Sequence, residues 1–257
     1  NELTHVEVAH GGGGGAANPA NVTVDDFDRL RLTNALLRES AGVGLYVGQD
    51  ADLPGFSMNV LRDNAGPGIR LSTELLGALD TGSDYTTGNG QSYLDVYAES
   101  VNRPQTWRIT AAPIRLSGSV TIWSSVTIVP GARLMMGAGA GLTVSGSLNA
   151  VGTAAAPIRF LGEQPSRGYW RGITFNSSAA ANELTHVEVA HGGGGGAANP
   201  ANVTVDNFDR LRMTNALIRD SAGWGLFVGT SGVVTPSPVQ ANGNIFSNNA
   251  LGASNIP

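Results

Sequence analysis

The sequence predicts an all-β fold, a right-handed parallel β-helix in which the chain winds as a solenoid of short strands. Residues 1–48 return as residues 182–229 with six differences, and a solenoid accommodates such a copy because each coil packs only on its neighbours. Apolar residues recur every 22 positions between residues 114 and 160, in pieces too short for helices. Glycine supplies 36 of the 257 residues, which favours tight turns between strands.

Short alternating apolar pieces predict three strands in each turn of about 22 residues. VTI at 120–122 and at 126–128, LMM at 134–136 and LTV at 142–144 each follow the period of a strand. Each strand is expected to pair with its equivalent in the next turn, about 4.8 Å away. The expected inward columns are Ile114 with Met136 and Ile158, Val120 with Leu142, Ile122 with Val144, and Val126 with Leu148.

The duplicated segment follows the same expected spacing and carries insertions. Three further pairs lie 22 residues apart, namely Val24 with Tyr46, Val205 with Phe227, and Val189 with Leu211. The stretch HGGGGGAANPA at 10–20, repeated at 191–201, predicts loops that project from the solenoid, because five successive glycines cannot fill a core. Residues 73–93 predict a further surface loop.

The repeat also predicts how the chain is organised. We expect residues 1–257 to be one β-helix fragment of about ten turns from a longer tandem array. Residues 1–104 would be the end of one repeat unit with a loop insertion, and residues 105–257 most of the next unit. Unpaired strands at the ends of a solenoid, together with near-identical copies, predict end-to-end or swapped self-association.

Composition excludes several classes of protein. The chain has no cysteine, which removes disulfides, thiolate metal sites and cysteine nucleophiles. It carries a formal net charge of −5 with no basic stripe, so nucleic acid is not an expected partner. No run of 18 or more apolar residues is present, so no membrane span is expected.

Histidines at the base of the glycine runs are candidate ligand contacts. His10 and His191 directly precede the two runs, and each run could approach a ligand closely. The alternative is a loop that leaves a strand with an exposed histidine at its base. The run is not a phosphate loop, because no lysine and no helix pattern follow it.

An acidic turn occurs in both copies. VDDFDR contains Asp25 and Asp28, and VDNFDR contains Asp206 and Asp209. Their carboxylates could offer oxygen ligands to Ca²⁺, provided that an irregular turn gathers them. The alternative is a solvated corner beside arginines. Apart from this candidate Ca²⁺ site, no cofactor is expected.

One tryptophan differs between the copies. Trp224 stands where the first copy has Val43, a volume change that a closed core resists, so we expect an exposed side chain and a sugar-stacking contact. No catalytic residue is assigned, since no GxSxG nucleophile motif occurs and a single sequence does not show which carboxylates lie together across turns.

The chain resembles bacterial right-handed parallel β-helix repeat proteins of the pectate-lyase-like superfamily. The resemblance is carried by residues 117–163, with VPG, VSG and API-F elements, by GYWRGITFNSS at 168–178 and by LTHVEVAHGGG at 184–194. It covers most of 105–257 and, through the duplication, 1–71. It implies an extracellular or cell-surface protein, and enzymes of the superfamily act on acidic polysaccharides. Their Ca²⁺-binding acidic cluster and catalytic arginine have no matching motif here.

Two functions are therefore expected from different classes. The first is a non-enzymatic extracellular scaffold or adhesin module that contacts carbohydrate or a host or neighbouring cell surface, because duplication extends reach and multiplies one face. The second is a polysaccharide lyase or glycoside hydrolase acting on acidic polysaccharide. The first is preferred, since charged residues are only 14% of the chain and its surface features come in duplicate.

Overall fold

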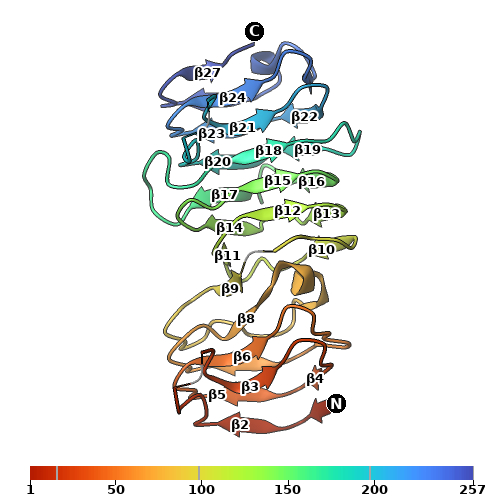
Figure 1. Ribbon diagram of the computed structural model, residues 1–257, viewed down its shortest axis with the longest axis vertical. Helices are drawn as coiled ribbons and strands as arrows, with labels where there is room; N and C mark the ends of the chain where they lie inside the picture. The colour runs from red at the N-terminus through yellow and green to blue at the C-terminus, as the bar shows by residue number, and fades with distance from the viewer. Residues whose placement is uncertain (16, 98, 197, 257) are drawn as a thin grey trace. The chain divides into compact units, whose positions relative to one another are not determined.

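The computed structural model describes residues 1–15, 17–97, 99–196 and 198–256. The predicted fold class is confirmed: the chain is an all-β parallel solenoid of about ten turns, with roughly 25 residues per turn. It divides into two compact units, of which unit 1 is Asn1–Tyr97 with Arg108–Arg115, and unit 2 is Ala98–Trp107 with Leu116–Pro257. Within each unit the strands of successive turns lie one above another (Figure 1).

Unit 1 stacks short strands in parallel register. Among its described residues, β1 pairs with β4, β5 lies between β2 and β7, and β3, β6, β8 and β9 pair in that order. The bounds are β1 (Glu2–Thr4), β2 (Glu7–Ala9), β3 (Ala20–Val24), β4 (Arg31–Thr33), β5 (Leu36–Arg38), β6 (Val43–Val47), β7 (Val60–Arg62), β8 (Ile69–Ser72), the 3₁₀ helix η1 (Thr73–Ala78), β9 (Leu94–Tyr97) and β11 (Ile114–Leu116), whose last residue belongs to unit 2.

Unit 2 has the predicted three strands in a turn. In its described part the first sheet runs β10-β13-β16-β19-β22-β25, the second β12-β15-β18-β21-β24-β27 and the third β14-β17-β20-β23-β26. The bounds are β10 (Gln105–Trp107), β12 (Val120–Ile122), β13 (Ser125–Ile128), β14 (Arg133–Met136), β15 (Leu142–Val144), β16 (Ser147–Val151), β17 (Ile158–Gly162), β18 (Ile173–Phe175), β19 (Glu183–Thr185), β20 (Val187–Ala190), β21 (Ala201–Val205), β22 (Arg210–Thr214), β23 (Leu217–Arg219), β24 (Trp224–Val228), β25 (Val233–Thr235), the 3₁₀ helix η2 (Val239–Ala241), β26 (Ile245–Ser247) and β27 (Gly252–Ser254).

The predicted inward columns are confirmed where a turn has 22 residues. Pairing in register joins Val120 to Leu142, Ile122 to Val144 and Val126 to Leu148, all of them buried. Ile114, Met136 and Ile158 are also fully buried, but they do not form one column. Met136 pairs with Gly162 and Ile158 pairs with Val187, because the turn that separates β14 from β17 is longer than 22 residues.

Turn length varies because loops of different length occupy the corners. Val24 pairs with Val47 and Val205 with Val228, so Tyr46 and Phe227 are each one residue out of the predicted column. Val189 pairs with Ile218 and not with Leu211, which lies in a different sheet. The residue pairs joined across neighbouring turns range from Gln105↔Val126 to Ala150↔Leu184, and register is kept throughout.

The predicted loops are only partly free of the solenoid. The described residues of 11–19 and 192–200 lie outside strands, as predicted. Gly192 and Gly193 are nevertheless buried, whereas Gly195 and Gly196 are exposed. Residues 73–93 are not a free surface loop, because they contain η1 and bury Leu75, Leu76 and Tyr85.

Buried asparagines tie neighbouring turns together. Asn59 accepts from the Ala35 amide at 3.0 Å and donates to the Leu32 carbonyl at 2.9 Å. Asn244 accepts from the Ala216 amide at 3.0 Å. One carboxamide thus supplies the donor and the acceptor that corner backbone groups need once water is excluded.

Candidate functional site

A row of threonines lies on the outer face of the second sheet of unit 2. Strand register places Thr121 beside Thr143, Thr143 beside Thr174, and Thr174 beside Thr204. Their neighbours along each strand point inward and are buried, as alternation requires. The hydroxyls therefore repeat at about the 4.8 Å spacing of paired strands. The row ends at Phe227, which pairs with Thr204.

A groove follows this row. Its floor includes Thr143, Thr174 and Thr204. Its walls include Ser119, Arg171, Gly194, Gly195, Asn199, Pro200 and Ala201. No aspartate, glutamate or histidine lines the groove among the residues that the structure describes. The lining therefore offers hydroxyls, one amide and one guanidinium, which are the groups that hold sugar hydroxyls and anionic oxygens.

Arg171 is the charged group of the groove. Its amide donates to the Ala140 carbonyl at 2.7 Å, which fixes the backbone at the start of the strand. Its exposed side chain forms no ion pair with any residue in the described ranges, unlike most arginines of the chain. An unpaired guanidinium beside polar hydroxyls is suited to bind a carboxylate or a similar anion.

A second depression continues along the same face. It is lined by Asn199, which it shares with the groove, and by Phe227, Asp206 and Thr230 among others. Of the predicted contact residues, Asp206 lines this depression, and Trp224 pairs with Ala201, which lines the groove. A ligand that runs along the threonine row would reach the half-exposed ring of Phe227.

The acidic turns gather two aspartates each. The Asp28 amide donates to the Asp25 carbonyl at 3.1 Å, and the Asp209 amide donates to the Asp206 carbonyl at 3.3 Å. Burial, reinforced by the Asp206 charge, raises the pKa of Asp209 above its ordinary value. In the described part of the chain no group of three or more His, Asp or Glu side chains could hold a metal ion, so Ca²⁺ binding stays a prediction.

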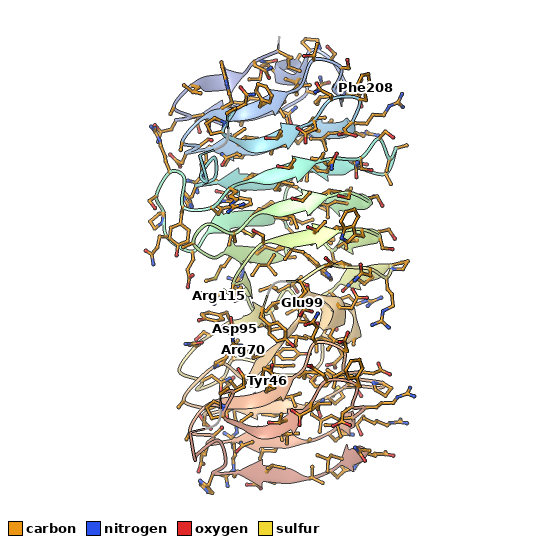
Figure 2. All side chains as sticks on the ribbon, in the orientation of Figure 1. Tyr46, Arg70, Asp95, Glu99, Arg115 and Phe208 are labelled. Atoms are coloured by element: carbon orange, nitrogen blue, oxygen red, sulfur yellow. The ribbon has the colours of Figure 1, made fainter. Side chains whose placement is uncertain are left out.

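Each acidic turn presents an exposed aromatic ring. Phe27 and Phe208 have φ angles of 66° in both copies, and their exposed fractions are 84% and 76%. Figure 2 shows Phe208 at the edge of unit 2. The left-handed backbone of this turn is one that bulky residues rarely adopt.

The two candidate histidines occupy different environments. His10 is exposed, and its Nδ1 lies 3.1 Å from Glu39 Oε2. His191 is only 7% exposed, and its Nδ1 has no hydrogen-bond partner in the described structure. Asp220 replaces Glu39 in the second copy. It accepts from Arg219, as Glu39 accepts from Arg38, and it also accepts from Asn248. Burial, followed by the nearby Arg219 charge, lowers the pKa of His191.

Trp224 is half-buried and not fully exposed as predicted. It begins β24, where it pairs with Ala201 on one side and Gly252 on the other. A Cβ added at Gly252 would lie 3.3 Å from the Trp224 ring, so the glycine leaves room for it. In the first copy Val43 lies beside Pro67, whose carbonyl accepts from the Gly44 amide. The neighbouring turn therefore explains how this large substitution is accommodated.

Two carboxylates of the chain are each shared by two arginines. Glu188 accepts from Arg159 at 3.1 Å and from Arg219 at 2.7 Å. In unit 1, Asp95 lies between Arg70 and Arg115, at 3.4 Å and 2.9 Å, as Figure 2 shows. The side chains of Asp95 and Glu188 are only 12% and 16% exposed, and each is paired with two arginines, so neither carboxylate is free to contact a ligand.

Sequence reasoning missed the groove. The threonines at the centres of VTI, LTV, ITF and VTV were visible as a recurrent outward residue, but their register depends on turns of unequal length. No sequence motif identified Arg171 as a binding residue. Whether its guanidinium forms an ion pair depends on which side chains surround it in the folded protein.

Comparison with known proteins finds no significant match: no protein-family model, no curated protein and no solved structure is similar to this chain. The resemblance to the pectate-lyase-like superfamily therefore remains an expectation about the fold type. In the part of the chain that the structure describes, no helix is long and apolar enough to cross a membrane.

Proposed function

We propose that this chain is a non-catalytic module of an extracellular or cell-surface protein, and that it binds acidic polysaccharide along the groove of unit 2. The observation that carries the proposal is the unpaired Arg171 above a register of threonine hydroxyls. A polysaccharide repeats its hydroxyls along its length, as the threonine row does along the solenoid. The guanidinium adds a preference for a chain that carries carboxylates.

The lining of the groove favours binding over hydrolysis. Glycoside hydrolysis requires two carboxylates placed about the scissile bond, one of them able to donate a proton. The groove is lined by no aspartate or glutamate of the described structure, and Asp206 lies in the neighbouring depression. A lyase or hydrolase remains the alternative, and the experiment below separates it from binding.

The test is binding of polygalacturonate by the purified chain, with a fully methyl-esterified polymer as the uncharged comparison. We expect the charged polymer to bind better, and its affinity to fall as salt is added. R171Q should weaken binding about tenfold or more, because a hydrogen bond to a charged group contributes about 1.5–3 kcal/mol. Binding constants from calorimetry give both comparisons.

R133Q is the matched control. Arg133 is exposed and has no ion pair within the described residues, but it lies on β14, in a different sheet from the groove. It should bind as the wild type does. Equal affinity of R171Q and wild type would contradict the proposal. Release of reducing ends or of unsaturated products from polygalacturonate would show that the chain is a hydrolase or a lyase and not a non-catalytic module.

A further inference from the structure

The two glycine runs have the same sequence and different surroundings. A Cβ added at Gly195 would lie 2.9 Å from Arg171 Cγ and 3.2 Å from its Cδ and Nε. The equivalent residue of the first copy is Gly14, and a Cβ there would meet no atom within 4 Å. Both glycines have left-handed backbones, with φ angles of 84° and 89°. The two positions therefore differ in what lies beside them and not in their own conformation.

The beginning of each run has the same structural role in both copies. A Cβ at Gly11 would lie 2.8 Å from Asn21 Oδ1, and one at Gly192 would lie 2.6 Å from Asn202 Oδ1. These glycines allow a corner asparagine to approach the backbone closely. The difference between the copies begins after this shared part, where the run of the second copy reaches the groove.

Contacts on two sides limit the conformations of Arg171. The run of the second copy approaches Arg171 through Gly195. Gly141 also lies close to it, since a Cβ added at Gly141 would lie 3.4 Å from the Arg171 Cβ. A free arginine side chain loses much rotamer entropy when it binds a ligand. Packing between two glycines removes part of that freedom in advance, which favours binding.

We infer that Gly195 is a positioning residue that holds Arg171 over the threonine row, where a polyanion binds. The inference rests on the proposed function. The ligand class is a polysaccharide with carboxylate groups, which match the planar fork of a guanidinium.

The experiment compares G195A with G14A. Both substitutions place a side chain on a left-handed backbone, so both should lower the melting temperature by similar amounts. Only G195A forces Arg171 away, and it should weaken polygalacturonate binding about tenfold, the scale of one hydrogen bond to a charged group. G14A should bind as the wild type does. The double variant R171Q/G195A should bind no worse than R171Q, because both changes act on one interaction.

The outcomes separate this inference from the proposed function. If R171Q weakens binding but G195A and G14A bind equally, Gly195 is not a positioning residue and the proposed function stands. If R171Q has no effect, both fail. Should G195A not fold, ¹⁵N relaxation of the arginine Nε groups in the wild type decides: greater order at Arg171 than at the exposed Arg133 supports the inference, and equal order overturns it.

Discussion

Asn202 should contribute more to stability than its identical counterpart Asn21. Its Oδ1 accepts from the Gly192 amide at 2.7 Å, and its Nδ2 donates to the Arg219 carbonyl at 2.7 Å. The side chain is fully buried. N202A therefore leaves the buried Gly192 amide and the part-buried Arg219 carbonyl without this partner, at about 1–3 kcal/mol each, or about 4 kcal/mol in total.

N21A is the control, because Asn21 makes the equivalent hydrogen bonds at a half-buried position. The Gly11 amide donates to Asn21 at 2.8 Å, and Asn21 donates to the Arg38 carbonyl at 2.8 Å. Water can replace these partners, so the net loss should be about 1 kcal/mol for each bond.

Urea denaturation followed by circular dichroism measures the difference between the two variants. A solenoid need not unfold in two states, so amide exchange over residues 187–193 gives a local value as well. Equal losses of stability in N202A and N21A would refute the reasoning, because they would show that burial does not set the value of these bonds.

Two further changes test the core and the buried histidine. M136D places an unpaired charge at a fully buried position and should lower the stability of unit 2 by several kcal/mol, whereas M135D, at the half-buried neighbour on the opposite face, should change the urea midpoint much less. His191 has a lowered pKa in the folded protein, so below about pH 6.5 the unfolded chain binds a proton that the folded chain does not. Stability should therefore fall as pH decreases from 7 towards 5. H191Q should reduce that slope in pH-dependent urea titrations. H10Q should retain it, because His191 is intact. An unchanged slope in H191Q would show that His191 is not the source of the pH dependence.

The fold could be predicted because it depends on patterns that survive in a single sequence. The duplication and the alternation of apolar residues predict stacked strands, and the column of Val120 and Leu142 has the predicted partner. The column of Ile114, Met136 and Ile158 was wrong in register although each residue is buried. Alternation fixes which face is inward, whereas pairing depends on corner loops whose lengths follow no period.

The candidate site could not be predicted in the same way. Thr143, Thr174 and Thr204 come from three turns, and only the strand register shows that they form one row. Arg171 is distinguished by its place in the groove, where it forms no ion pair with any residue in the described ranges. The environments of His10 and His191 differ because other residues surround them in the fold. The identical sequence next to the two histidines therefore could not predict the difference.

The unequal turns have a consequence for how such a chain changes over generations. Strand pairing is kept whether the paired residues are as close in sequence as Val120 and Leu142 or as distant as Ala150 and Leu184. An insertion at a corner therefore adds surface without shifting the residues that hold the turns together, and the loss of a few hydrogen bonds at one corner is confined to neighbouring turns. Loops can therefore lengthen without disturbing strand pairing, and strand residues can also change singly: the glycine loops of the two copies are identical, whereas four of their six differences lie within strands.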